Sequence, residues 1–168
     1  VRAAGLARGA RCGHPSAHPM TLSLVERALC ARAPLVADDP AHESALRLCN
    51  GFTEGVPALS VELYARTLVL HDYAPGLDGD PALSLSVLAL ARELFPFVTS
   101  AVRKVRRARE PSLRVGEFLL GTRVDLPAFV REEGVEYAVD LTLNRDASFY
   151  LDTRALRRWA RASLAGKS

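Results

Sequence analysis

The sequence has few cysteines, no long apolar run and only four histidines. Its three cysteines lie far apart without a C-x-x-C pair, which argues against a disulfide framework or a thiolate zinc site and favours reduced thiols in the cytoplasm. Every apolar stretch is interrupted by Arg, Glu, Pro or Asp before it reaches the roughly 18 residues of a membrane-spanning helix. His14 and His18 have a metal-compatible spacing, but the proline after each prevents the helix that would present both rings together.

The composition that remains is that of a globular protein. Hydrophobic residues make up 49% and charged residues 24% of the 168 positions, which excludes a wholly disordered chain. Twenty-two Lys and Arg against 19 Asp and Glu leave a net charge of +3, so the chain is mildly basic. This length is enough for one domain, or for one compact domain and part of another.

Residues 1–36 are predicted to form a partly disordered amino-terminal extension. Their first 20 residues contain Gly, Pro and His without periodicity, and the Arg-rich start suits either an organellar transit peptide or an over-extended reading frame whose natural start is Met20. Apolar residues then recur at helical spacing, with Thr21 as the expected N-cap and Pro34 as the expected end of the helix.

The period then changes to that of strands. Residues 45–51, 58–64 and 67–73 alternate, and a two-residue connection, Ala65-Arg66, joins the last two segments into a β-meander. Asp80-Pro81 opens a helix that ends at Phe95-Pro96, and residues 97–106 and 115–121 are two more strands. The expected fold class is α+β, a small antiparallel sheet with a helix (β-β-β-α-β-β), which forms an accessory RNA-binding-type domain over residues 37–126.

The sequence pattern changes again after residue 121. Residues 129–141 are predicted to form a hairpin that turns at Glu133-Gly134, and residues 153–165 a final helix capped by Asp152. The apolar stripe of that helix is expected to face inward; it consists of Leu156, Trp159, Ala160 and Leu164.

Two groups of cations suit contact with phosphates. The first, which we predict to bind RNA, consists of Arg103, Lys104, Arg106, Arg107 and Arg109. The second lies on one side of the final helix and consists of Arg154, Arg157, Arg158 and Arg161. The alternative for both groups is a solvated surface in an Arg-rich composition.

No catalytic set can be assembled from the residues alone. His71 in a strand is expected to be a packing residue, and Cys49 a small buried side chain, because no histidine base can be assigned to the thiol. No Gly-rich phosphate loop follows a strand. The residue chemistry therefore indicates a basic α+β module without an active site.

Two segments nevertheless carry a family resemblance. Residues 48–69 resemble the pattern N-G-E-x-D-G-L-P-G-L-x-V-D-x-Y-x-x-x-L-V, and residues 135–154 resemble a hairpin strand followed by G-Q-K-T-G-F-F-L-D-Q-R. Residues 101–104 match a short V-R-K stretch between them. The family is the class I S-adenosylmethionine (SAM)-dependent methyltransferases that act on cytosine C5 of bacterial large-subunit ribosomal RNA, and the resemblance spans about residues 45–168.

The resemblance implies that residues 127–168 begin a Rossmann-like methyltransferase domain, here truncated before the SAM-binding core and the catalytic cysteine. It implies SAM as the cofactor of the full-length parent and large-subunit ribosomal RNA as the partner, and leaves a homodimer open. The residues implied to bind the cofactor are Phe149, Tyr150, Asp152 and Arg154. The Asn144-Arg-Asp-Ala-Ser segment departs from G-Q-K-T-G, and a purely structural role explains the four residues equally well.

Three functions are therefore in view. The leading one is the amino-terminal part of an RNA methyltransferase, inactive alone. The others are a stand-alone basic RNA-binding module without catalysis, and a structural fragment whose arginines are compositional.

Overall fold

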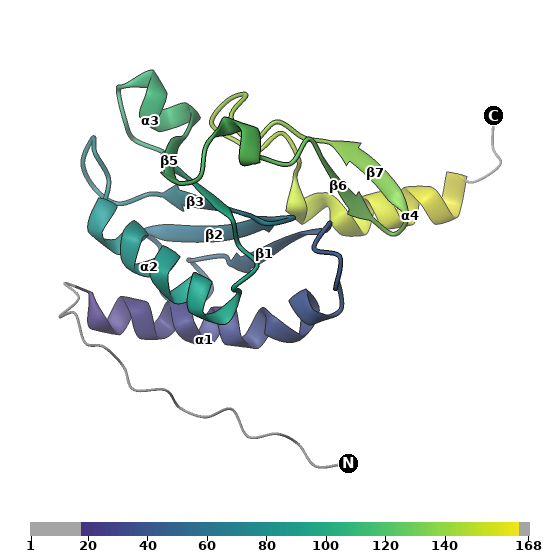
Figure 1. Ribbon diagram of the computed structural model, residues 1–168, viewed down its shortest axis with the longest axis horizontal. Coiled ribbons are helices and arrows are strands. Elements are labelled where there is room, and N and C mark those ends of the chain that lie inside the picture. Colours follow the sequence, from purple (N-terminus) through teal and green to yellow (C-terminus); the bar gives the residue numbers. More distant parts are fainter. Residues whose placement is uncertain (1–17, 165–168) are drawn as a thin grey trace, which may run out of the picture.

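A five-stranded sheet forms the centre of the molecule, in a computed structural model that describes residues 18–164 (Figure 1). The helices and strands of the first part are α1 (Pro19–Ala37), β1 (Ala45–Cys49), β2 (Leu59–Tyr64), β3 (Thr67–Asp72), α2 (Pro81–Leu94), β4 (Ser100–Val105), α3 (Pro111–Val115) and β5 (Glu117–Leu120). Those of the second part are a 3-10 turn η1 (Arg123–Asp125), β6 (Phe129–Glu132), β7 (Val135–Ala138), a 3-10 turn η2 (Leu151–Thr153) and α4 (Arg154–Leu164).

The strands of the sheet follow the chain in the order β1-β2-β3-β4-β5. All five predicted strands are confirmed, and so is the β2–β3 hairpin, in which Tyr64 pairs with Thr67. The prediction of an antiparallel sheet is wrong at one place, because β3 and β4 pair in parallel. Helix α2 connects them, and a strand–helix–strand connection returns the chain to the same edge, so that neighbouring strands run the same way. The sheet is therefore mixed.

Helix α2 forms as the sequence predicts. The carboxylate of Asp80 accepts a hydrogen bond from the backbone N–H of Leu83 at 2.9 Å, and Pro81 occupies the first turn, where its missing N–H costs nothing. Leu83, Val87 and Ala91 of this helix are buried, whereas Leu94 is exposed.

Helix α1 is longer than predicted. It begins at Pro19, so Thr21 lies within its first turn and is not the N-cap, and it continues through Pro34 to Ala37. Proline inside a helix removes one backbone hydrogen bond, but the carbonyl of Pro34 still accepts from the N–H of Asp38 at 3.1 Å, which continues the helical pattern beyond the proline.

The same helix belongs to the core and not to a separate extension. Val25 and Leu29 are fully buried and join one apolar cluster with residues of α2 and the sheet. The predicted boundary at residue 37 therefore does not separate this helix from the domain. Residues 1–17 of the predicted extension, including His14 and Cys12, lie outside the described residues.

The two faces of the sheet have different covers. One face lies against α1 and α2 and is mainly apolar, with Leu63, Leu68 and Leu70 in its core and the buried Arg103–Asp72 ion pair at one end. The other face packs Tyr64 and Val69 against residues from the C-terminal part of the chain, namely Val130, Val139, Leu141 and Ala147. Because side chains alternate along a strand, the same strands serve both layers.

The predicted hairpin is confirmed as β6 and β7, with its turn at Glu133-Gly134. The predicted orientation of the final helix is wrong. Leu156 and Trp159 of α4 are each 60% exposed and Leu164 is 55% exposed, so the apolar stripe faces outward. The predicted N-cap is not observed either. Asp152 lies in the 3-10 turn that precedes α4, and its side chain accepts no hydrogen bond among the described residues. Among residues 18–164, no helix is long and apolar enough to cross a membrane.

Candidate functional site

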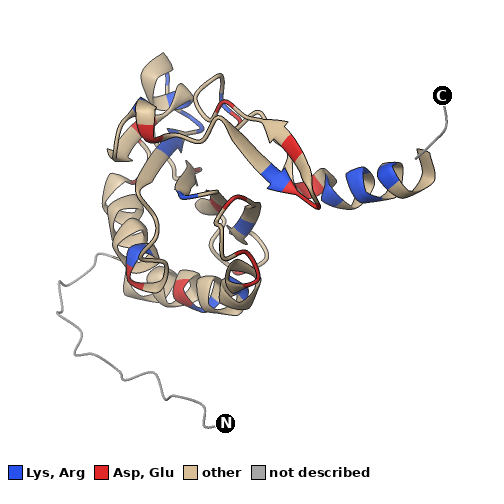
Figure 2. Ribbon diagram, turned by 45° about the vertical axis from the view of Figure 1, so that its right-hand side comes forward, with Lys and Arg blue, Asp and Glu red and all other residues tan. Residues whose placement is uncertain are grey.

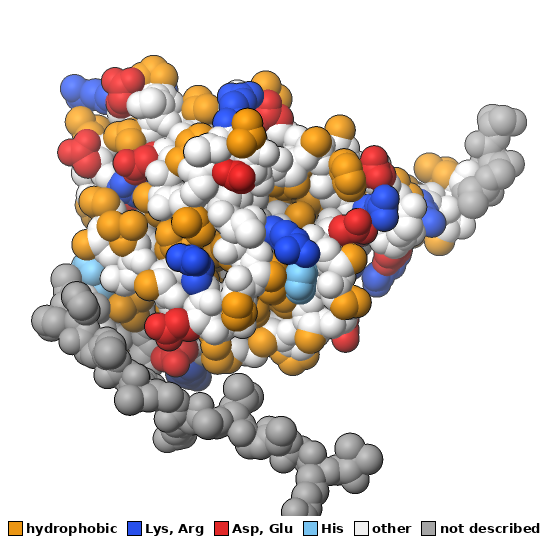
Figure 3. Space-filling view, in the orientation of Figure 1, with side chains coloured by type: hydrophobic (Ala, Val, Ile, Leu, Met, Phe, Trp, Pro, Cys, Tyr) orange, Lys and Arg blue, Asp and Glu red, His pale blue; other side chains and the backbone are white. Residues whose placement is uncertain are grey.

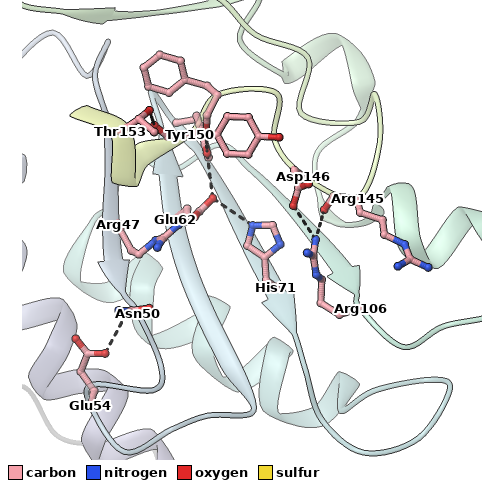
Figure 4. Close-up of polar contacts among 12 residues, drawn as sticks. Arg47, Asn50, Glu54, Glu62, His71, Arg106, Arg145, Asp146, Tyr150 and Thr153 are labelled. Atoms are coloured by element: carbon pink, nitrogen blue, oxygen red, sulfur yellow. Dashed lines mark hydrogen bonds and ion pairs between the residues drawn. The ribbon is translucent and has the colours of Figure 1, made fainter. Parts of the chain in front are cut away.

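Four polar side chains form a connected group on the face of the sheet opposite α1 and α2, and we call it the Glu62 cluster (Figure 4). Its members are Arg47, Glu62, Tyr64 and His71. Arg47 lies opposite Glu62 in the β1–β2 pairing and donates to Glu62 Oε1 from Nε at 3.1 Å and from Nη2 at 2.7 Å. His71 Nε2 lies 3.1 Å from Glu62 Oε2, and the Tyr64 hydroxyl lies 3.0 Å from that same oxygen. The carboxylate thus has partners on both oxygens.

The cluster is buried, and burial governs its protonation. Burial alone would raise the pKa of Glu62, but the hydrogen bonds and positive charges of His71 and Arg47 outweigh it and lower that pKa from 4.5 to about 2. Burial, followed by the charge of Glu62, raises the pKa of Tyr64 above its ordinary value. The Nδ1 atom of His71 is buried and has no hydrogen-bond partner among the described residues. Since an unpaired buried polar atom costs free energy, it marks a place where the cluster is incomplete.

The predicted RNA-binding cations divide into a buried pair and an exposed group. The guanidinium of Arg103 is buried, lies 3.1 Å from Asp72 Oδ2 through Nε and 2.8 Å from Glu117 Oε2 through Nη1, and also donates to the carbonyl of Asp78. Each of its three guanidinium nitrogens has a partner within the fold and the residue is buried, so Arg103 has no free surface for a phosphate. Its role in the structure is to join β3, β4 and β5.

Lys104 is fully buried on the other face of β4. Its ammonium group donates to the carbonyl oxygens of Asn144 at 2.6 Å and Asp146 at 2.9 Å. Burial lowers the pKa of Lys104 to about 8, while the nearby carboxylates oppose that shift. Lys104 therefore anchors the 144–148 segment to β4 and, like Arg103, is not available to RNA.

Arg106 is half-buried and binds the same segment. Its Nη1 donates to the carbonyl of Arg145 at 2.7 Å and lies 3.0 Å from Asp146 Oδ1. The 144–148 segment stands where the family pattern has G-Q-K-T-G, from which it departs, and Ser148 adopts φ of +55° at the position of the second glycine. A left-handed backbone at this position explains the glycine of the pattern. The structure thus brings the basic stretch and the family motif into contact.

Arg107 and Arg109 are exposed, and within residues 18–164 neither forms an ion pair. Arg145 is exposed as well, and Figure 4 shows its side chain pointing away from the Glu62 cluster. Positive and negative side chains do not gather into one patch on the face shown in Figure 3. The exposed cations beside the 144–148 segment are therefore the ones that remain free to contact a phosphate.

The four predicted cofactor residues lie in succession but have different surroundings. Phe149 is half-buried, with the Arg157 guanidinium 4.2 Å from its ring centroid, whereas Tyr150 is 61% exposed. Asp152 and Arg154 line an open hollow of about 120 Å³ beside β1. Pockets that enclose a whole small-molecule ligand measure roughly 300–1,000 Å³. These residues therefore form at most one wall of a cofactor site.

Arginines of α4 pair with glutamates of the β6–β7 hairpin, and Figure 2 shows the basic positions of the projecting helix close to the acidic positions of the hairpin. Arg157 donates to both oxygens of Glu132, at 3.0 and 2.7 Å, and Arg154 lies 3.7 Å from the same carboxylate. Arg158 pairs with Glu133. This second predicted phosphate-binding group is thus largely engaged within the chain.

The expectation that Cys49 is a small buried side chain is confirmed, whereas His71 is not only a packing residue, because it pairs with Glu62. Cys49 is buried, and burial raises the pKa of its thiol, as expected for a packing residue and not for a nucleophile. In the part of the chain that the structure describes, no group of three His, Cys, Asp or Glu side chains could hold a metal ion.

The sequence interpretation missed the Glu62 cluster, although a signal was present. Arg47, Glu62 and His71 occupy positions of β1, β2 and β3 that the register places on one face, with Lys104 paired to His71 on β4. A polar residue at the inward position of each successive strand is unusual for a sheet buried on both faces. Aligning the predicted strands by register would have revealed this row.

Known proteins that are similar to this chain in sequence or in structure are named as methyltransferases. No protein-family model matches the chain. It is 32% identical over 124 residues to the ribosomal RNA large subunit methyltransferase I of Shewanella amazonensis, which covers 73% of this chain and 31% of the relative. It is 27% identical over 113 residues to a ribosomal RNA large subunit methyltransferase of Deinococcus radiodurans, which covers 67% of this chain and 28% of the relative. The chain thus spans about a third of the length of the curated relatives it matches.

The solved structures agree in fold. A proposed SAM-dependent methyltransferase from Streptococcus mutans superposes with a TM-score of 0.67 at 20% identity, covering 87% of this chain and 36% of that one. A second, a proposed methyltransferase complexed with SAH, gives a TM-score of 0.65 at 19% identity with the same coverage. The chain is therefore similar in sequence to ribosomal RNA methyltransferases, and its mixed α/β fold occurs within proteins assigned as SAM-dependent methyltransferases.

Proposed function

We propose that this chain is part of a SAM-dependent RNA methyltransferase and that this part of the enzyme binds RNA. The observation that carries the proposal is the contact between the basic stretch and the 144–148 segment, in which Arg107, Arg109 and Arg145 are each exposed. Arginine guanidinium groups without carboxylate partners are suited to phosphate oxygens. The sequence similarity to ribosomal RNA methyltransferases supports the same substrate class.

The domain division, the substrate and the methylated position that we propose follow from the resemblance of the motifs. On this proposal residues up to about 126, with α1, form an accessory RNA-binding domain, and the segment from 127 onward begins the methyltransferase domain. The substrate would be large-subunit ribosomal RNA, methylated at cytosine C5 in the cytoplasm, and the chain alone would be inactive. The covalent chemistry is assigned to a cysteine elsewhere in the parent protein, since Cys49 is buried and its thiol pKa is raised.

The residues present fit one side of a SAM site. The exposed carboxylate of Asp152 can accept hydrogen bonds from hydroxyl groups, and the ring of Tyr150 is open to stacking. When bound, SAM would supply the methyl group. The open hollow beside these residues does not enclose a molecule of that size, so weak or undetectable binding of SAM to this chain alone is expected.

The test of RNA binding is a titration of the purified chain with RNA at several salt concentrations. Replacing Arg107 and Arg109 by Gln should weaken binding and should reduce the slope of log K against log salt by about 0.7–0.9 for each phosphate that the variant no longer neutralises. Lys104→Met is not a suitable probe, because it would disturb the 144–148 segment.

Arg92→Gln is the matched control, since Arg92 is an exposed arginine on α2, the helix on the opposite face of the sheet. It should leave the salt slope unchanged. An equal effect of Arg92→Gln, or a slope unaffected by replacement of Arg107 and Arg109, would contradict the proposed surface.

A further inference from the structure

A small slot opens next to the Glu62 cluster, between the sheet and the segment that carries the family motif. It has a volume of about 70 Å³, and its lining includes the whole cluster together with Tyr73, Asp146 and Tyr150. Figure 4 shows Tyr150, Glu62, His71 and Asp146 grouped on this side of the sheet. The slot is therefore built from residues far apart in the sequence, with a charged floor.

The rim of the slot is aromatic and basic. Tyr73 is 41% exposed and Tyr150 is 61% exposed, so both rings present surface to solvent. The Arg106 guanidinium lies 5.7 Å from the Tyr73 ring centroid, and Arg145, which supplies a backbone carbonyl to Arg106, extends outward. Exposed aromatic rings among arginines are the arrangement by which proteins bind single-stranded nucleic acid, with bases on the rings and phosphates on the cations.

The size of the slot limits what can enter. A volume of about 70 Å³ is well below the roughly 300–1,000 Å³ of pockets that enclose whole ligands, so only the edge of a planar ring would be inserted. A nucleoside buried in full does not fit. A base that belongs to an RNA strand, with its face against a tyrosine and its sugar outside, does.

The floor supplies an unused polar atom. Nε2 of His71 lies 3.1 Å from Glu62 Oε2, whereas Nδ1 on the other side of the ring is buried and has no hydrogen-bond partner among the described residues. His71 is 6% exposed, and its ring centroid lies 6.5 Å from that of Tyr73. A polar group on the edge of a base that rests on Tyr73 would give this nitrogen a hydrogen-bond partner.

We propose that this slot takes one unstacked base of a single-stranded RNA, which stacks on Tyr73 with its edge toward His71, while Arg107 and Arg145 contact the neighbouring phosphates. The inference rests on the proposed RNA-binding function and adds to it a strand preference and a base-binding position. It requires that the bound RNA be single-stranded at this point, because a paired base cannot present its edge and its face at once.

The experiment compares a 12-nucleotide oligocytidylate with a 12-base-pair RNA duplex of mixed sequence, both titrated against the full chain. The single strand should bind more tightly. Tyr73→Ala should weaken its binding about 5- to 150-fold, the range expected for removal of one base–aromatic stack, without changing the salt slope. Tyr73→Phe should retain most of the affinity, since the ring is kept.

Trp159→Ala is the matched control, because Trp159 is also an exposed aromatic residue, on α4 outside the slot. Tyr73→Leu, which keeps apolar bulk without an aromatic face, serves as a second variant if Tyr73→Ala does not fold. Both Tyr73→Leu and Tyr73→Ala should bind the single strand equally weakly, and Trp159→Ala should bind it as tightly as the unmodified chain.

The possible failures are distinct. No RNA binding by the unmodified chain would overturn both the proposed function and this inference. Salt-dependent binding that is insensitive to Tyr73→Ala and Tyr73→Leu, or equal binding of duplex and single strand, would overturn only the slot. Competition between the oligocytidylate and labelled SAM, with cofactor binding abolished in Tyr73→Ala, would also overturn it, because the slot would then belong to the cofactor.

Discussion

The two faces of the central sheet are built on opposite principles. The face against α1 and α2 is mainly apolar: core side chains such as Leu29, Leu70 and Val87 are fully buried, and the Arg103–Asp72 ion pair is buried beside them. The other face carries Arg47, Glu62 and His71 and is covered by the 139–149 segment and not by a helix. Packing thus stabilises one face, whereas hydrogen bonds and ion pairs organise the other.

The two faces of the five-stranded sheet can therefore serve different purposes, one for stability and the other for the proposed recognition of RNA. An apolar face gains free energy from burial whatever its exact contacts, while a charged face is stable only when each group finds its partner. The exposed tyrosines proposed to bind RNA, Tyr73 and Tyr150, line the slot on the second face. The predictions that follow test how far the two faces can be separated.

The largest loss of stability is expected on the helix-covered face. Leu70→Ala removes a fully buried side chain from β3 and leaves a cavity, so the free energy of unfolding should fall by about 2–5 kcal/mol. Chemical denaturation measures this change. Leu85→Ala, at a position of α2 that is 52% exposed, should change it by less than about 0.5 kcal/mol, and similar losses in both variants would contradict the assignment of the core.

Acid should lower the free energy of unfolding through Glu62 on the other face of the sheet. Since the pKa of Glu62 is lowered from 4.5 to about 2 in the folded chain, its stabilising contribution is present above pH 4.5 and is lost as pH falls toward about 2. The loss should amount to about 3 kcal/mol at most. Denaturation curves recorded between these pH values measure it, and Glu62→Gln should show a smaller acid dependence over that window. An unchanged dependence in Glu62→Gln would contradict the role of this carboxylate.

A more local effect is expected where α4 meets the hairpin. Glu132→Ala removes the buried acceptor of Arg157, a charged hydrogen-bonded pair whose loss should cost about 1.5–3 kcal/mol. Amide hydrogen exchange should accelerate in α4 while β2 and β3 stay protected. Glu136→Ala, which removes the exposed partner of Arg131, should cost about 1 kcal/mol or less. Faster exchange throughout the sheet in Glu132→Ala would show that the two parts do not separate.

The smallest expected effect is an increase in stability at the turn between β2 and β3. Ala65 adopts φ of +53° in the two-residue turn between β2 and β3, a backbone conformation that glycine adopts without steric cost. Ala65→Gly should raise the free energy of unfolding by about 0.5–1 kcal/mol in thermal or chemical denaturation. Ala82→Gly, at an exposed position in α2, should lower it by about the same amount, and a matching loss at position 65 would contradict the turn geometry.

Much of the fold could be predicted from the local pattern. The alternation in residues 45–73 and Pro81 at the start of α2 predict elements that the structure confirms to within a few residues. The end of α1 could not be predicted in the same way, because Pro34 usually terminates a helix and is tolerated here near the last turn.

The orientation of α4 shows a second limit. Helical spacing predicts that its arginines share one side and its apolar residues another, but not which side packs inward. Here the carboxylate of Glu132, in the strand β6 that precedes the helix, pairs with Arg157 and turns the apolar stripe outward. Burial of Arg103 has the same kind of cause, since its partner Asp72 lies 31 positions away.

The buried ammonium group of Lys104 has a practical consequence for chemical labelling. The sequence contains only two lysines, and the other, Lys167, lies outside the described residues. With its pKa lowered to about 8, the Lys104 amine would be largely neutral and reactive above that pH, but the carbonyls of Asn144 and Asp146 enclose it. An amine-directed reagent can therefore modify Lys104 only when the 144–148 segment lifts. The mass-spectrometric rate of that modification would report the opening of the segment in the native chain, without any introduced probe.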